Sequence, residues 1–242
     1  MYDDLRDKIE NGRLPPGAHL PGEIELASVH GVSRQTVRTA LTRLTQEGLI
    51  TEGRGRLGRT VRDGIKLRWD LGVFERGPRR DNAATGMDDW AAGVAAQGCT
   101  PRQTVNVTIE PAPKEIADSL GIAEGEMAVR RSRVRYVNDR PYQLSTSWFP
   151  ESISRGTPLM QAGDVAMPGG ILKAIGHPQA RIRDELYVRM PTPTEKDQLD
   201  LPIGTPVAQH VRTGYDAADR PVRVMVTIAP GDRHVLVYEL EV

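Results

Sequence analysis

The sequence predicts an α+β protein of two domains, a short helical domain followed by a larger one built around a mostly antiparallel sheet. Helical apolar spacing, interrupted by turn glycines, runs through the N-terminal part of the chain. Further along, the segment 111–141 resembles the segment 191–221, and alternating apolar residues follow both. We expect a first domain at 1–63, a linker at 64–85 and a second domain at 86–242. Within the linker, Trp69 to Phe74 is a candidate strand that either domain could take up.

The charge is unevenly distributed along the 242 residues. The chain has 32 basic and 32 acidic residues, which excludes a uniformly basic nucleic-acid binder. Residues 33–62, however, carry seven Arg and two Glu, a net charge of +5. A positive field confined to one face attracts a phosphate backbone. The core must be largely aliphatic, because only two Phe and three Trp are present.

Cys99 is the single cysteine, so no internal disulfide can form. The acidic, polar start does not resemble a signal peptide, and no apolar run has the length of a membrane span. We therefore expect a soluble, cytoplasmic protein.

Two helices are expected before residue 31. The first has its apolar residues on one face and ends at Gly12, and the second opens after Pro21-Gly22. Gly31 suits a tight turn with positive φ, and Ser33 is a good N-cap for a third helix. The apolar residues of the first two helices are Tyr2, Leu5 and Ile9, then Ile24, Leu26, Ala27 and Val29.

The third helix has two contrasting faces. Its core stripe is Val37, Ala40, Leu41 and Leu44, and its polar face is Arg34, Gln35, Arg38, Thr39 and Thr42. A helix, a glycine turn and a helix with Arg and Gln near its start form a helix-turn-helix. Arg can bind guanine and Gln can bind adenine through paired hydrogen bonds. From this helix alone, an ordinary solvated face is an equal alternative.

The flanking segment favours DNA binding. A strand at 49–51, a Gly- and Arg-rich turn and a return strand at 60–62 form a wing that can clamp phosphates or enter a minor groove. The glycines also match the dinucleotide fingerprint, but that motif needs a helix directly after it, so we do not expect a nucleotide. The predicted DNA-binding residues are Ser33, Arg34, Gln35, Thr36, Arg38, Arg54, Gly55, Arg56 and Arg59.

The first 62 residues closely resemble the winged-helix domain of the GntR family of bacterial regulators. The resemblance is carried by Gly12 to Gly17, Leu20-Pro21, Glu25 to Ala27, Gly31 to Arg34, Thr36 to Arg38, Ala40-Leu41, Leu44 and Glu47 to Leu49. It implies DNA contacts by Arg34, Gln35, Thr36, Arg38 and the wing. Many relatives have Arg where this chain has Ile24, so one contact is missing or is supplied by another residue.

Each repeated segment of the second domain reads as a short helix, a turn, a strand, an Asp-Arg-Pro hairpin and a second strand. Paired positions include Arg133 with Arg212 and Tyr136 with Tyr215. Two repeats are too few for a solenoid, so we expect a pseudo-twofold duplication around one sheet. A further strand is expected within 234–242.

The second domain resembles the ligand-sensing (UTRA-type) domain of the HutC subfamily, whose fold is similar to that of chorismate lyase. The carrying residues are Leu120 to Ile122, Gly125, Arg133, Arg135, Asp139 to Pro141, Tyr215-Asp216 and Gly231 to Arg233. The resemblance implies that arginines matching Arg133 and Arg135 hold an anionic group of an effector.

Arg133 and Arg135 alternate on one predicted strand and so point to the same face. Either the two guanidinium groups hold an anion between them, or they pair with Asp and Glu side chains or face the solvent. Relatives that sense sugar phosphates often have a hydroxyl residue where this chain has Ala91, and Glu where it has Ser145 and Arg223. Because these positions differ, we expect a carboxylate or phosphate effector rather than an amino-sugar phosphate. The predicted effector-binding residues are Arg133, Arg135, Ser145, Gly170 and Arg223.

An enzyme is the rival class, because the second domain resembles a lyase fold. The five histidines have no metal spacing, and Cys99 has no obvious base beside it, so we expect no catalysis, cofactor or metal. A DNA-binding protein whose second domain only dimerises is a further alternative. The favoured reading is a homodimeric repressor that binds a palindromic operator and responds to a small anion.

Overall fold

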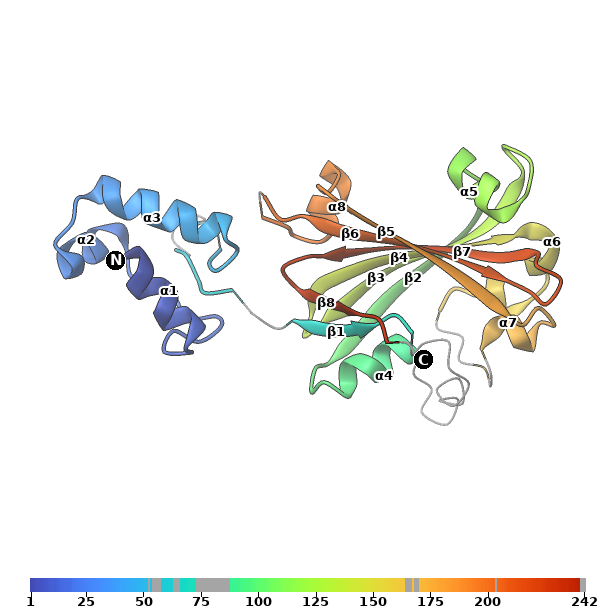
Figure 1. Cartoon of the computed structure of the whole chain (residues 1–242), viewed down its shortest axis with the longest axis horizontal. Coiled ribbons are helices and arrows are strands. Elements are labelled where there is room, and N and C mark those ends of the chain that lie inside the picture. Colours follow the sequence, from blue (N-terminus) through green and yellow to red (C-terminus); the bar gives the residue numbers. More distant parts are fainter. Residues whose placement is uncertain are drawn as a thin grey trace.

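The computed structural model describes residues 1–51, 53, 58–62, 66–72, 88–163, 167, 170–202 and 204–239. Three N-terminal helices lie beside a domain built on a six-stranded sheet, which confirms the α+β class (Figure 1). The first domain contains α1 (Tyr2–Glu10), α2 (Glu23–His30) and α3 (Arg34–Gln46).

The second domain has two copies of one strand, helix and hairpin unit. The first copy is β2 (Pro101–Pro111), α5 (Lys114–Leu120), β3 (Met127–Val137) and β4 (Arg140–Pro150). The second copy is β5 (Arg181–Arg189), α8 (Pro193–Gln198), β6 (Val207–Tyr215) and β7 (Pro221–Pro230). The remaining elements are β1 (Leu67–Asp70), α4 (Asp89–Ala95), α6 (Glu151–Ser154), η4 (Pro158–Met160), α7 (Ile171–Ala174) and β8 (His234–Val237).

The core of the first domain is the predicted apolar stripe of α3 packed on the other two helices. Val37, Leu41 and Leu44 are at most 1% exposed and contact buried Leu5 and Leu26. Leu44→Ala would leave a cavity that the surrounding side chains fill only in part, and would therefore cost about 2–5 kcal/mol of stability. The apolar residues of α2 do not all face this core.

Ile24 and Val29 of α2 are 69% and 70% exposed. Only Leu26 of this helix is buried, so its contribution to the core is narrow. Ile24 therefore stands on the surface.

The base of the predicted wing is present as backbone pairing. Ile50 pairs with Val61, and the amide of Thr51 donates to the carbonyl of Thr60 at 2.8 Å. His19 also pairs with Thr60. Ile50 and Val61 are buried, so this pairing is tied into the core of the domain.

The strand order of the sheet is β2-β3-β4-β7-β6-β5, and every neighbouring pair is antiparallel. The two copies meet where β4 pairs with β7, at the centre of the sheet. This is the pseudo-twofold arrangement that the repeated sequence predicts. The hairpins turn at Asp139 and Asp219, both with positive φ, which Asp tolerates better than most residues.

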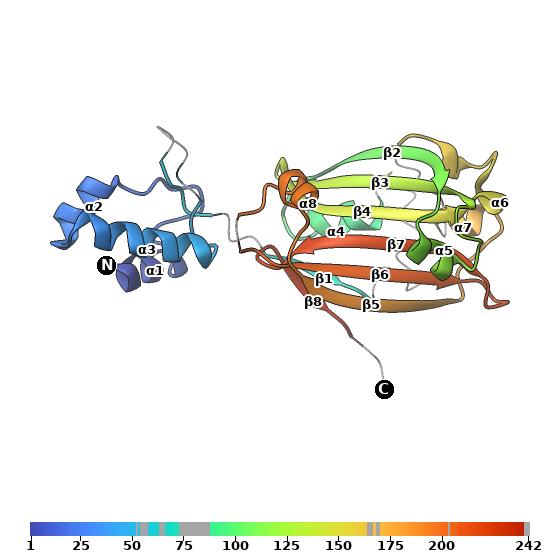
Figure 2. The same ribbon diagram turned by 90° about the horizontal axis from the view of Figure 1, so that it is seen from above.

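The two faces of the sheet are covered differently. Helices α5 and α8 lie on one face near opposite ends, whereas α4, α7 and the pair β1–β8 lie on the other (Figures 1 and 2). Trp148 and Val224 pack under α5, and Val207 and Ile228 pack with the residues that follow α8. Trp90 of α4 packs on the opposite face.

The segment predicted as a linker, 64–85, is not wholly a linker. Leu67–Asp70 form β1, which pairs in parallel with β8 from Leu67↔His234 to Asp70↔Val237. Leu67 and Trp69 are buried, and this burial fixes the strand on the second domain. Residues 73–87 lie outside the described residues. The predicted strand at 234–242 is shorter, ending at Val237.

An ion pair connects the two domains just before β1. Arg62 Nη1 lies 2.7 Å from Asp232 Oδ2, in the turn between β7 and β8. Arg233 in the same turn donates to the carbonyls of Pro141, Leu199 and Asp200. The turn that receives Arg62 is thus itself anchored to the start of β4 and to the segment that follows α8.

Candidate functional site

The start of α3 is built as an exposed polar surface. Ser33 Oγ accepts the amide of Thr36 at 3.1 Å, so the predicted N-cap forms. Gly31 has a φ of 62°, which allows the tight turn from α2. Arg34, Gln35 and the neighbouring residues Ser33, Thr36 and Arg38 are all exposed, opposite the buried stripe of the helix.

Glu23 at the start of α2 contacts two predicted DNA-binding residues, one on α3 and one in the wing. Its carboxylate accepts Arg38 Nε at 2.8 Å and lies 3.6 Å from Arg59 Nη1. The hydrogen bond from Arg38 lowers the pKa of Glu23. The structure therefore brings Arg38 and Arg59 together. Arg54, Gly55 and Arg56 lie outside the described residues.

A cavity of about 200 Å³ opens on the face of the sheet that carries α4. Three of the predicted effector-binding residues line it, namely Arg133, Arg135 and Arg223. Arg212 of β6 also lines it, which makes four arginines around one small space. The other described lining residues are Trp69, Asp88, Asp89, Trp90, Ile171 and Met225. This space is called the arginine cavity below.

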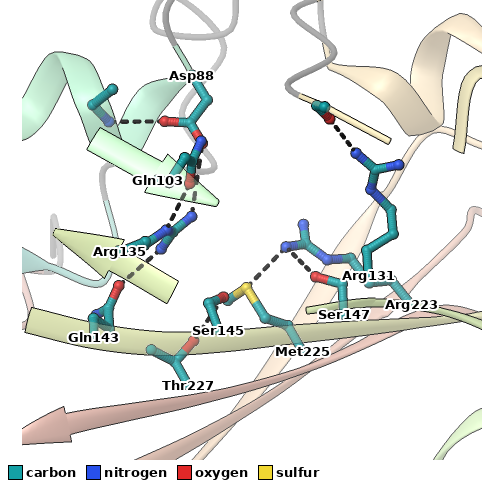
Figure 3. A network of polar contacts seen from close by, with 12 residues as sticks. Asp88, Gln103, Arg131, Arg135, Gln143, Ser145, Ser147, Arg223, Met225 and Thr227 are labelled. Carbon is teal, nitrogen blue, oxygen red and sulfur yellow. Dashed lines mark hydrogen bonds and ion pairs between the residues drawn. The ribbon is translucent and has the colours of Figure 1, made fainter. Parts of the chain in front are cut away.

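Arg135 is held by a network that runs from β4 to the N-terminus of α4 (Figure 3). It donates to Gln143 Oε1 at 2.8 Å and to Gln103 Oε1 at 3.3 Å. Gln103 donates in turn to Asp88 Oδ2 at 2.8 Å, and Arg135 Nη2 lies 3.8 Å from the same oxygen. Arg135 is thus partly neutralised within the chain.

Asp88 combines two structural tasks in this network. It caps α4 by accepting the amide of Ala91 at 2.8 Å, and it pairs with Arg135. Burial alone would raise the pKa of Asp88, but Arg135 and the Ala91 amide outweigh it and hold the pKa below its usual range. Asp88 therefore stays ionised and positions α4 against the sheet.

Asp184 of β5 fixes the guanidinium group of Arg212 through paired hydrogen bonds. Its Nε and Nη2 each lie 2.7 Å from one carboxylate oxygen, and Nη2 also donates to the Leu71 carbonyl at 2.6 Å. His210 Nε2 bonds the same carboxylate at 2.8 Å. Burial would raise the pKa of Asp184, but the hydrogen bonds from Arg212 and His210 hold it far below its usual range.

Arg223 and Ser147 belong to the floor of the cavity. Arg223 Nη2 donates to Ser147 Oγ at 3.2 Å and lies 2.8 Å from Met225 Sδ (Figure 3). Arg223 therefore adds positive charge to the wall of the cavity.

Two predicted effector-binding residues are not on the described wall of this cavity. Ser145 is 1% exposed and lies 3.4 Å from Thr227 Oγ1, beneath the cavity floor. Gly170 is the N-cap of α7 with a φ of 86°, next to the lining residue Ile171. Their assignment as effector contacts stays a prediction.

Sequence reasoning missed several residues of the site. Arg212 was detectable, because it occupies the position of Arg133 in the second repeat. Arg131 also follows the alternation of Arg133 and Arg135. It is 1% exposed and donates to the carbonyls of Leu159, Gln161 and Gly163, so it holds the loop that follows η4.

The described part of the chain contains no group of three or more His, Cys, Asp or Glu side chains placed to hold a metal ion. Among the same residues, no helix is both long and apolar enough to cross a membrane.

Comparisons with known proteins agree with this division. The family "Bacterial regulatory proteins, gntR family" matches residues 1–56, and the UTRA domain family matches residues 97–235. The repressor NagR of Bacillus subtilis is 27% identical over 242 residues, covering all of this chain and 93% of its own. The regulator GgaR of Escherichia coli K12 is 26% identical over 238 residues, covering 98% and 88%.

Among solved structures, PhnF from Mycobacterium smegmatis matches with a TM-score of 0.61 at 24% identity, covering 99% of this chain and 98% of its own. That likeness supports the fold. The relatives are transcriptional regulators and not enzymes. The chain belongs to the GntR family of bacterial transcriptional regulators and, through its UTRA domain, to the HutC subfamily.

Proposed function

We propose that this protein is a repressor that binds a palindromic operator as a homodimer and is controlled by a small anion in the arginine cavity. The observation that carries the proposal is the meeting of four arginines around a cavity of about 200 Å³. Repression is preferred over activation, because occupying a promoter needs no further partner. The naming of the relative NagR as a repressor supports the same choice.

The DNA-binding surface is proposed to be the exposed start of α3 with the wing beside it. Ser33, Arg34, Gln35, Thr36 and Arg38 line one face, which suits entry into a major groove. Glu23 holds Arg38 in place before DNA arrives. The proposal includes the wing residues Arg54, Gly55, Arg56 and Arg59.

Arg38→Ala tests this surface, and Arg43→Ala is the matched control on the same helix. Arg43 pairs with Glu47 at 3.1 Å and stacks over the Tyr2 ring, away from the proposed groove contact. An operator is first selected from genomic fragments with the purified protein. Loss of one bidentate base contact, about 1–3 kcal/mol, weakens operator binding roughly 5- to 150-fold in Arg38→Ala. Equal operator affinity of the two variants would remove the assignment.

The dimer is proposed to form through the second domain, so that two winged helices reach half-sites about one helical turn apart. The sheet face between α5 and α8 supports this, since the described elements leave its centre uncovered (Figure 1). Partly buried Leu144, Val211 and Val226 lie on that face. Val226→Glu should shift sedimentation toward a monomer, and an unchanged dimer would place the contact elsewhere.

The effector is proposed to be a carboxylate or phosphate. Carboxylate partners are described for Arg135, which pairs with Asp88, and for Arg212, which pairs with Asp184. The cavity wall nevertheless gathers more positive than negative charge, and an added anion offsets the mutual repulsion of the guanidinium groups.

Arg133→Ala tests the effector site, and Arg130→Ala is its control. Both lie on β3, but Arg130 faces the other side of the sheet, 3.7 Å from Glu110. A thermal-shift screen of acidic metabolites and inorganic phosphate identifies a stabilising anion. Arg133→Ala should abolish that stabilisation, while Arg130→Ala keeps it. A normal response of Arg133→Ala would show that Arg133 does not bind the anion.

A DNA-binding protein whose second domain only dimerises is the second candidate function. The ion pairs of Arg135 with Asp88 and of Arg212 with Asp184 favour it, because buried ion pairs can be purely structural. Operator affinity that no anion changes, in a protein that still dimerises, would select this candidate.

A further inference from the structure

A second cavity lies between α4 and the linker strand β1, with a volume of about 230 Å³. Trp69 and Trp90 line both this space and the arginine cavity, so the two cavities adjoin at these residues. The remaining described lining residues are Leu67, Arg68, Asp70, Gly93, Val94, Ala96, Gln97, Gln143 and His234. We call it the tryptophan cavity.

The two glutamine side chains of the tryptophan cavity are already engaged within the chain. The Gln97 amide accepts the backbone N–H of Arg68 at 2.8 Å and donates to the carbonyls of Arg68 and Gly93. Gln143 Oε1 accepts Arg135. Two indole rings and aliphatic side chains form much of the remaining wall, which suits an apolar and planar occupant.

His234 gives the cavity one hydrogen-bond acceptor. Its Nδ1 donates to the Pro230 carbonyl at 3.0 Å, so in the neutral ring Nε2 carries the lone pair. Burial lowers the pKa of His234 to about 4, and the ring is therefore neutral at pH 7. The ring lies edge-on to Trp69, with centroids 6.3 Å apart, and packs beside Tyr142.

We propose that the tryptophan cavity is a second ligand site, which takes a small neutral aromatic molecule carrying one hydroxyl or N–H donor. The indoles of Trp69 and Trp90 offer faces and edges for ring packing, and His234 Nε2 is the acceptor for the donor. The arginine cavity, lined by four cations, suits a different chemistry.

The position of the cavity gives its occupant a route to the DNA-binding domain. Its wall includes β1, whose first residue Leu67 donates its amide to the Arg233 carbonyl at 2.9 Å. The neighbouring Asp232 holds Arg62 of the first domain. A ligand that shifts β1 therefore acts on the same turn that connects the two domains.

Gly93 provides the variant for the test. It lines the tryptophan cavity, and a Cβ added there meets no atom within 4 Å. Gly93→Met therefore places at the cavity wall, with little strain, a flexible side chain long enough to enter the cavity, and it raises helix propensity in α4. Ala95→Met is the matched control, because Ala95 is exposed on the same helix and is not part of the described lining.

The probe is 4-fluorophenol, neutral at pH 7, followed by its ¹⁹F line width in the presence of the full-length protein. We expect binding to the wild type, weakening of at least tenfold in Gly93→Met, and a change within twofold in Ala95→Met. Saturating inorganic phosphate and Arg133→Ala should both leave the phenol bound, since they address the arginine cavity.

Absence of binding, or equal binding to Gly93→Met, overturns the second site. Displacement of the phenol by phosphate also overturns it, because the two spaces would then act as one. If phosphate itself fails to bind while the phenol binds as described, the second site stands and the anionic effector falls.

Discussion

Asp184→Asn should strongly destabilise the second domain. The substitution keeps the shape of the side chain and removes its charge from between Arg212, which is 3% exposed, and the fully buried His210. Breaking one partner of a buried pair costs about 3–5 kcal/mol, because the remaining charge is left uncompensated. Asn Oδ1 still accepts one hydrogen bond, so we expect about 3 kcal/mol, a large part of the stability of an ordinary domain.

The assay is urea unfolding followed by tryptophan fluorescence, which reports on Trp69 beside His210. Asp219→Asn is the control, since Asp219 bonds Arg181 at the exposed end of the same strand and is 72% exposed itself. Surface pairs contribute little, so this variant should unfold with the wild type. Phosphate should stabilise Asp184→Asn more than the wild type, because Arg212 lines the cavity. A loss under 1 kcal/mol, or equal losses in both variants, would refute the reasoning.

Two further predictions concern the turn between β7 and β8. Asp232→Asn removes the partner of Arg62 and should speed hydrogen exchange of the neighbouring Leu67 amide about tenfold, whereas unchanged exchange would mean that the ion pair does not hold this junction. Because the pKa of His234 is lowered to about 4, the unfolded chain binds the extra proton between about pH 6.5 and pH 4, and stability falls as the pH drops through that window. The loss of stability is at most about 3 kcal/mol, since the cavity admits water to part of the ring. In His234→Gln, the pH dependence of the free energy of unfolding, measured with urea, should shrink by that amount. A pH profile like that of the wild type would contradict this prediction.

The first domain could be predicted almost completely, because its signals are local. An N-cap at Ser33, a left-handed glycine at Gly31 and the apolar spacing of α3 each act over a few residues. The exposure of Ile24 could not be predicted in the same way. It depends on the angle at which the short α2 packs on the other helices. The apolar character of Ile24 does not indicate that angle.

The sheet was predictable from duplication, since two similar sequences fold into two similar units. Strand β1 was predictable only in part. The stretch from Trp69 to Phe74 indicates a strand, but its parallel partner β8 lies at the far end of the chain. A strand of four residues carries no local signal of which domain it joins. Burial of Leu67 and Trp69 against the second domain decides their conformation.

The arginine cavity was predictable in its cations but not in their partners. Alternation placed Arg133 and Arg135 on one face. The carboxylates that neutralise part of this charge come from distant segments, Asp88 from the start of α4 and Asp184 from β5. Such pairing follows from the fold as a whole, which no local pattern encodes.

The most direct test of the account is operator affinity measured with and without the stabilising anion. Fluorescence anisotropy of a labelled operator should report at least fivefold weaker binding when the anion saturates the wild-type protein, the lower end of ordinary allosteric coupling. Arg133→Ala should bind the operator normally and ignore the anion. Operator affinity that is the same with and without anion in the wild type, or equally anion-sensitive in Arg133→Ala, would contradict control of DNA binding through the arginine cavity.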